Sequence, residues 1–169
     1  MQNIEQKAQS IGPVRVVLVD DSAMFGERLA EILSAIENVR VLGWGESVAA
    51  GQQLLLEHNP DLLVLDIDLP GESGIDLLQL AHLQNPKLVI VMLTNNDHPR
   101  LRERCSELGA SFYFHKPTEI GKIIEVCEGL VRSRSAATEM QRHFDQLQTL
   151  VHGCRADLRA LITVPGAKF

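Results

Sequence analysis

The sequence predicts an α/β protein built on a doubly wound, five-stranded parallel sheet. Short runs of Val, Leu and Ile recur along the chain, and segments of helix length separate them. Continuous apolar runs are typical of parallel strands that are buried on both faces. Five strand–helix units in series favour helices on both faces of one sheet, joined by right-handed crossovers. The expected strand order is 2-1-3-4-5.

The five strands are indicated by β-branched and aliphatic residues that lie between turn signals. The second run is shorter and more polar than the others, which is typical of an edge strand. The expected strands are residues 14–19, 39–44, 62–67, 88–93 and 111–114.

The helices are indicated by apolar residues at helical spacing and by residues that favour helix ends. Ser22 can cap the first helix, Pro99 fits the first turn of the fourth, and Gly109 can end that helix. The loop LPGESG, which contains Gly74, indicates a shaped turn before the third helix. The first helix is expected after Ser22, with an apolar face from Phe25 to Ile36, and the other expected helices are residues 48–58, 75–83, 99–109 and 118–132.

The composition is that of an ordinary globular protein. The net charge of −6 does not support a broad attraction to nucleic acid or to anionic membranes. Cys105, Cys127 and Cys154 lack metal-ligand spacing and are expected to be free thiols. No apolar run approaches the length of a membrane span, and the first residues lack the apolar core of a secretory signal. We therefore expect a cytoplasmic protein that binds neither DNA nor membranes directly.

Polar residues lie at the carboxyl ends of four expected strands. Asp20 and Asp21 follow the first strand, and Asp66 lies at the end of the third. Thr94 follows the fourth strand and Lys116 follows the fifth. Parallel sheets of this class bind ligands outside the carboxyl ends of their strands, so these side chains are expected to converge. A single aspartate at a strand end is more often a helix cap or a turn residue, but the five together favour a common site.

These residue types suit the phosphorylation of a carboxylate. Asp20, Asp21 and Asp66 would repel one another unless one is protonated or a cation binds among them. Mg²⁺ is the expected cation, because it takes carboxylates, water and phosphate oxygens as ligands. Asp66 is the expected nucleophile, since it lies on the central strand with acidic neighbours beside it. The Thr94 hydroxyl and the Lys116 ammonium could each bind one phosphoryl oxygen.

The motifs closely resemble the receiver domain of two-component response regulators, which implies a flavodoxin-like fold. The resemblance covers residues 14–132, and its specificity comes from the order and spacing of the motifs rather than from any one of them. The motifs are Asp20-Asp21, the stretch PDLLVLDIDLPGESGIDLL around Asp66, Thr94 and Lys116-Pro117.

The resemblance implies a role for each of these residues. Asp66 is the phosphoacceptor, and the donor is a histidine kinase or a phosphotransfer protein. The chain would catalyse only its own phosphorylation and dephosphorylation, and it would signal through a downstream protein effector. Thr94 and Lys116 are implied to sense the phosphate, Tyr113 is the switch aromatic, and the Lys116–Pro117 peptide bond is expected to be cis. The implied Mg²⁺ ligands are Asp21 and Asp66 directly, Asp20 mainly through water, and the backbone carbonyl of Asp68.

Two residues depart from the family pattern. Asn95 follows Thr94 where receivers usually carry a small residue, and it is expected to narrow access to the site. Asn96, like Asp68, lies where receivers tune dephosphorylation, so the lifetime of the phosphorylated state does not follow from the family pattern.

Two other functions fit some of the same residues. Asp66 and Asp68 also resemble the aspartates of haloacid dehalogenase-type phosphatases, which use a nucleophile and a second aspartate two residues on. The order of the acids argues against this class, because Asp20-Asp21 precedes the nucleophile instead of following it. The other alternative is a receiver-fold scaffold that binds without phosphorylation, and the complete set of site residues argues against it.

The C-terminal segment follows a different pattern. The apolar phase of the last receiver helix stops near Arg132, and a new stripe then alternates four and three residues apart, as in a coiled coil. We expect a flexible segment at 1–13, a receiver domain at 14–132 and a helical extension at 133–169. The extension could fold back on its own domain, bind a partner or form a homodimer through residues 138–162, and we favour the homodimer. The stripe comprises Met140, Phe144, Leu147, Val151, Cys154, Leu158 and Leu161, and Gly153 could bend the helix within it.

Overall fold

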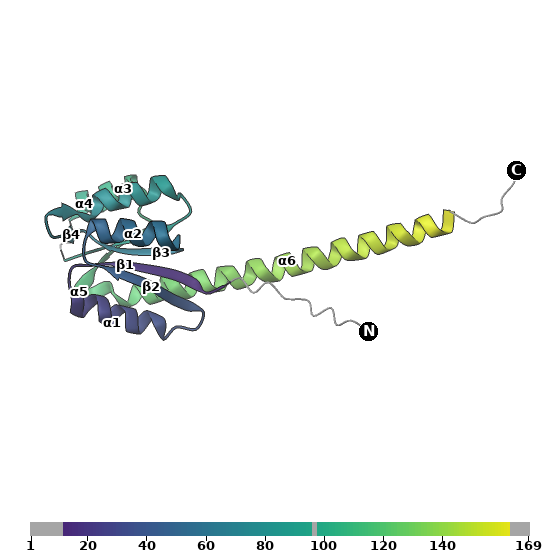
Figure 1. The fold of residues 1–169 in the computed structure, drawn as a ribbon, viewed down its shortest axis with the longest axis horizontal. Coiled ribbons are helices and arrows are strands. Elements are labelled where there is room, and N and C mark those ends of the chain that lie inside the picture. The colour runs from purple at the N-terminus through teal and green to yellow at the C-terminus, as the bar shows by residue number, and fades with distance from the viewer. Residues whose placement is uncertain (1–11, 96–97, 163–169) are drawn as a thin grey trace, which may run out of the picture. The chain divides into compact units, whose positions relative to one another are not determined.

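The computed structural model describes residues 12–95 and 98–162, and beyond residue 152 it describes the backbone alone. Gly12–Val131 form one compact unit, and the residues from Arg132 on belong to a second. Figure 1 shows the first unit as a sheet with helices on both of its faces. The predicted fold class is therefore confirmed.

The main sheet has five strands, and every neighbouring pair is parallel. The order β2-β1-β3-β6-β7 is the predicted one, and each strand lies within two residues of its expected bounds. The strands are β1 (Val14–Val19), β2 (Val39–Gly45), β3 (Leu62–Asp66), β6 (Val89–Thr94) and β7 (Phe112–His115).

Capping residues mark the start of the first helix and the end of the fourth, as the sequence predicted. The Ser22 hydroxyl accepts a hydrogen bond from the Phe25 amide, as predicted for the first cap. Gly109 has a φ of 103° just after the fourth helix, a left-handed conformation that favours glycine. The helices are α1 (Ala23–Ser34), α2 (Val48–His58), α3 (Gly74–Gln84), α4 (Pro99–Glu107), α5 (Lys116–Glu119) and α6 (Gly121–Ile162).

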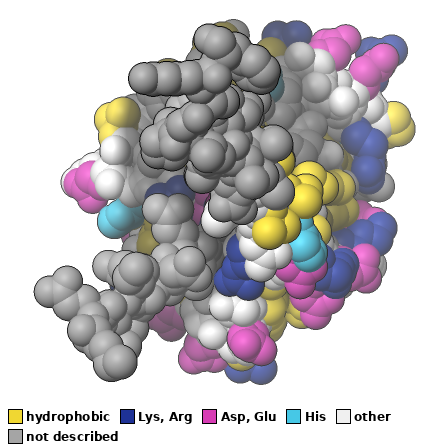
Figure 2. All heavy atoms as spheres, turned by 90° about the vertical axis from the view of Figure 1, so that its right-hand side faces the viewer, with side chains coloured by type: hydrophobic (Ala, Val, Ile, Leu, Met, Phe, Trp, Pro, Cys, Tyr) yellow, Lys and Arg dark blue, Asp and Glu magenta, His cyan; other side chains and the backbone are white. Residues whose placement is uncertain are grey.

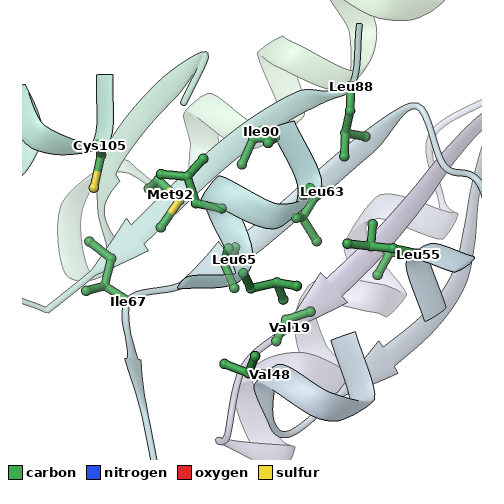
Figure 3. Close-up of a cluster of buried hydrophobic side chains, with 14 of the residues drawn as sticks. Val19, Val48, Leu55, Leu63, Leu65, Ile67, Leu88, Ile90, Met92 and Cys105 are labelled. Carbon is green, nitrogen blue, oxygen red and sulfur yellow. The ribbon is translucent and has the colours of Figure 1, made fainter. Parts of the chain in front are cut away.

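The sheet separates two apolar clusters, because successive side chains of a strand point to opposite faces. Val17 and Val19 of β1 join the cluster under α2, α3 and α4. Val16 and Leu18 join the cluster under α1 and the first turns of α6. Figure 3 shows most of the first cluster, to which β6 contributes Met92 and α4 contributes Cys105. Burial on both faces fixes the register of each strand, and it therefore fixes the position of the polar residues at the strand ends.

A short antiparallel hairpin joins β3 to α3. Its strands are β4 (Asp68–Leu69) and β5 (Glu72–Ser73), and Gly71 between them has a φ of 73°. Gly74 follows, and a Cβ at this position would overlap the carbonyl oxygen of Asp66. The sequence predicted a shaped turn here but not the two added strands.

The peptide bond between Lys116 and Pro117 is trans, because no cis bond occurs among the described residues. The prediction of a cis bond is therefore wrong. Pro117 lies in the first turn of α5, where its fixed φ suits the helix and its missing N–H leaves no helical bond unmade. The trans isomer is also the ordinary form of an X–Pro bond.

The last helix is longer than predicted. α6 has 42 residues and passes without a break through residues 133–138 and through Gly153. The predicted end near Arg132 is therefore wrong. The apolar phase does change there, but a change of phase only moves the buried face around the helix and does not interrupt its backbone hydrogen bonds. The segment SRSAAT contains neither Gly nor Pro. The Thr138 hydroxyl donates a hydrogen bond of 2.8 Å to the Arg134 carbonyl one turn earlier.

No helix within the described ranges is both long enough and apolar enough to cross a membrane. Basic and acidic side chains are interspersed over the described part of the face in Figure 2.

Candidate functional site

The predicted site residues lie at the carboxyl ends of the parallel strands. Asp20 directly follows β1, Asp66 is the last residue of β3, and Thr94 is the last residue of β6. Lys116 follows β7 and begins α5. Asp20, Asp66 and Thr94 expose only 3%, 2% and 0% of their surface. Buried polar side chains are costly unless they are paired, so their clustering marks this edge of the sheet as a candidate site.

The Lys116 ammonium lies between two of the buried carboxylates. Its Nζ is 2.6 Å from Asp20 Oδ2 and 2.5 Å from Asp66 Oδ2. The other carboxylate oxygens accept backbone hydrogen bonds, Asp20 Oδ1 from Ser22 at 3.0 Å and Asp66 Oδ1 from Asp68 at 3.2 Å. The two acids are thus fixed in place by the backbone on one side and by the ammonium on the other.

Burial and pairing shift the pKa values of this group. Burial raises the pKa of Asp66, and the hydrogen bond and charge of Lys116 offset only part of that rise. Burial lowers the pKa of Lys116, but its hydrogen bonds to Asp20 and Asp66 outweigh that effect, and the net change is upward. Lys116 is therefore charged throughout the neutral range.

Asp21 completes a group of carboxylates that fits a divalent cation. Asp20, Asp21 and Asp66 each offer one oxygen, and these oxygens lie within 4.8 Å of one another. The donor set is entirely anionic oxygen, which suits a hard cation that keeps some of its water. Asp21 is exposed, so a metal bound here would remain open to solvent and to a phosphoryl group. Asp68 is also exposed, and its backbone N–H contacts Asp66.

An open groove lies beside Asp21 and has a volume of about 830 Å³. Further carboxylates on its walls come from the hairpin and from the first turn of α3, namely Asp68, Glu72 and Asp76. The groove offers an approach to the acidic group from solvent.

Tyr113, the predicted switch aromatic, is buried on the α4 side of β7. The Arg102 guanidinium of α4 lies 4.7 Å from the centre of the Tyr113 ring, and Arg102 Nη1 donates a hydrogen bond of 3.0 Å to the Tyr113 carbonyl. These contacts tie α4 to β7 directly beside the site.

The loop after Thr94 is attached to the start of α5 through His115. His115 Nε2 is 3.3 Å from the Asn95 carbonyl, and Nδ1 is 3.0 Å from the Thr118 hydroxyl. Asn95 is exposed, and Asn96 lies outside the described residues.

Two aromatic residues contact the site that sequence reasoning did not assign to it. The Trp44 indole N–H donates a hydrogen bond of 2.9 Å to the Asp20 carbonyl. The Phe25 ring lies 4.7 Å from Lys116 Nζ. The sequence predicted only a packing role for Trp44 on its edge strand. Its contact with Asp20 could not be predicted, because the direction of the side chain depends on an irregularity in the β1–β2 register.

The pattern of the response regulator receiver domain matches residues 16–128 of this chain. A curated relative, protein-glutamate methylesterase/protein-glutamine glutaminase 1 of Albidiferax ferrireducens, is 32% identical over 76% of the chain and 34% of its own length. The chain therefore spans about a third of that relative.

Solved structures of similar fold include a CheY-like receiver domain protein from Methanospirillum hungatei. It has a TM-score of 0.66 and 22% identity, and the match covers 75% of this chain and 99% of that one. The response regulator domain of Thermotoga maritima CheB has a TM-score of 0.59 and 22% identity, and the match covers 75% and 97% of the two chains. These two structures share the fold. The family pattern over residues 16–128 shows that the chain belongs to the response regulator receiver family, and the strand order and the acidic edge of the sheet agree with it.

Proposed function

We propose that the chain is the phosphorylated component of a two-component relay, with Asp66 as its phosphoacceptor. The observation that carries the proposal is the Lys116 ammonium, which lies within hydrogen-bonding distance of two buried carboxylates at the open edge of the sheet. A buried cation placed there can bind an oxygen of an incoming phosphoryl group.

The transfer forms one bond and breaks one. An oxygen of Asp66 attacks the phosphorus in line, and the bond from phosphorus to the donor's leaving group breaks. With a phosphohistidine as donor, the imidazole leaves and takes up a proton. The Thr94 hydroxyl donates to one phosphoryl oxygen, and Lys116 donates to another.

The acidic group would hold Mg²⁺ during this transfer. Asp20, Asp21 and Asp66 supply the carboxylates, and the family pattern adds the backbone carbonyl of Asp68. When bound, the metal supplies positive charge to the remaining phosphoryl oxygen.

The experiment is intact-mass spectrometry after incubation with Mg²⁺ and acetyl phosphate. The chain should gain one phosphoryl group that hydroxylamine removes, and Asp66→Asn should gain none. Asp68→Asn is the matched control, because it removes a nearby exposed carboxylate and should still be labelled. An absent adduct in the wild type, or labelling of residue 66 in Asp66→Asn, would refute the phosphoacceptor role.

The proposed partners are a phosphodonor and a protein effector. The donor is a histidine kinase or a phosphotransfer protein, and the open groove beside Asp21 offers it a surface next to the acidic group. The chain would act on no other phosphorylated substrate, so a generic phosphomonoester should not be turned over. Steady turnover of such an ester would favour the phosphatase alternative.

The extension from residue 133 on is proposed to form a homodimer. Met140, Phe144, Leu147 and Val151 recur at four-three spacing, and all four are exposed, Leu147 by 61%. Neighbouring positions of the helix carry Gln141 and Gln148, which would not repel a second copy. In the sequence, the stripe does not continue the apolar phase of Ile120, Ile124, Cys127 and Val131.

Light scattering of two full-length variants tests the homodimer. Leu147→Glu places a charge in the stripe and should give monomers, while the adjacent Gln146→Glu should leave the dimer intact. A wild-type monomer whose residues 138–152 are protected from hydrogen exchange would instead support folding back on the same chain.

A further inference from the structure

We propose that Trp44 is a positioning residue for the acidic group, a role that rests on the proposed Mg²⁺-dependent phosphorylation. The indole N–H of Trp44 donates to the carbonyl oxygen of Asp20, and this carbonyl belongs to the peptide that joins Asp20 to Asp21. A peptide unit is planar, so fixing its carbonyl also fixes the direction in which Asp21 leaves it.

This hydrogen bond satisfies the Asp20 carbonyl, which lies just beyond the last backbone pair of β1 and β2. The paired residues of β1 and β2 end with Val19 opposite Gly45, and the Asp20 amide still donates a hydrogen bond of 2.9 Å to the Gly45 carbonyl. The chain turns into α1 immediately afterwards. The Trp44 side chain therefore provides the donor for the next carbonyl, at the point where the acids leave the sheet.

Asp21 is the member of the acidic group that depends most on this support. Asp20 and Asp66 are buried, and each contacts Lys116. Asp21 is exposed, so its place within 4.8 Å of the others depends on the backbone that carries it.

Gly26 of α1 makes room for the indole. A Cβ at Gly26 would lie 2.5 Å from the indole nitrogen of Trp44, which is closer than nonbonded atoms can approach. The absence of a side chain at Gly26 and the presence of an N–H at Trp44 are thus two parts of one contact. Either part can be removed separately.

The test compares Trp44→Phe and Gly26→Ala with the full-length wild type. Phe keeps an aromatic ring but lacks the N–H, whereas Ala at Gly26 keeps the indole but displaces it. Both variants should weaken Mg²⁺ binding, measured by calorimetry, by about three- to tenfold, the range that corresponds to one lost hydrogen bond. Both should also shift the Asp21 amide resonance in the metal-free protein.

Val41→Ala is the control, since it removes packing from the same strand while keeping both the indole N–H and Gly26. It should lower the melting temperature and leave the Mg²⁺ dissociation constant unchanged. The proposal is overturned if Trp44→Phe keeps the wild-type constant and the Asp21 resonance, or if Val41→Ala weakens binding equally. Failure of Asp66 labelling would refute the proposed function instead, and the comparison of Mg²⁺ affinities would still stand.

Discussion

At the scale of single residues, Gly74 shows how closely the backbone packs around Asp66. A Cβ at Gly74 would overlap the Asp66 carbonyl, whereas a Cβ at Gly121 would meet nothing within 4 Å. Gly74→Ala should therefore lower the free energy of unfolding by about 1–3 kcal/mol, the usual cost of forcing an extra group into a packed site. Gly121→Ala should be neutral or slightly stabilising. Urea denaturation of both variants checks this, and equal stabilities would contradict the close approach.

Cys127 should make the fold lose stability in alkali. Burial, with a smaller contribution from Glu128, raises the pKa of its thiol from 9.0 to about 11. Between these values the unfolded chain binds fewer protons than the folded one, so stability falls as the pH rises, by up to about 1.4 kcal/mol per pH unit.

Cys127→Ala should remove this part of the pH dependence, although it also lowers stability at pH 7 through lost packing. Ile123→Val, a packing loss in the same cluster without a titrating group, should keep the wild-type slope. Urea midpoints between pH 8 and pH 10.5 give the comparison. Parallel curves for Cys127→Ala and the wild type would contradict the assignment.

At the scale of elements, the unbroken α6 is the largest departure from what the sequence predicted. Ala136→Pro should interrupt the helix, because proline removes a backbone donor and clashes with the preceding turn at a cost of about 3 kcal/mol. We expect a loss of helical circular dichroism and faster hydrogen exchange around residues 133–140. Ala136→Ser should change neither by much. If both variants behave alike, this segment is a linker rather than a helix.

The strands could be predicted because burial on both faces leaves a continuous apolar run with sharp ends, as in LLVL before Asp66. The positions of Asp20, Thr94 and Lys116 followed from the same logic, since parallel strands end at one edge of the sheet. The contact of Trp44 with Asp20 could not be predicted, because it depends on a shift of register within β2. The predicted end of the last helix was wrong, because a change of apolar phase was interpreted as a break in the backbone.

At the scale of the whole molecule, binding at the acidic group should raise the stability of the entire receiver unit. A ligand that binds only the folded state stabilises it by mass action, so Mg²⁺ should raise the melting temperature progressively with concentration. Asp21→Ala should abolish the rise. Asp76→Ala, which removes a carboxylate from the groove wall but not from the acidic group, should retain it. A normal Mg²⁺ response in Asp21→Ala would place the ion elsewhere.

The position of Lys116 also makes it a counter-ion that the chain carries with it. In the metal-free protein its ammonium neutralises part of the repulsion between Asp20 and Asp66, so the carboxylates can stay assembled at the end of the sheet without a divalent ion. A dication bound among these carboxylates would have to share or replace contacts that the ammonium already makes. The affinity for such a metal would accordingly be a difference between two electrostatic attractions, and an ammonium displaced by it would be free to turn toward a phosphoryl oxygen.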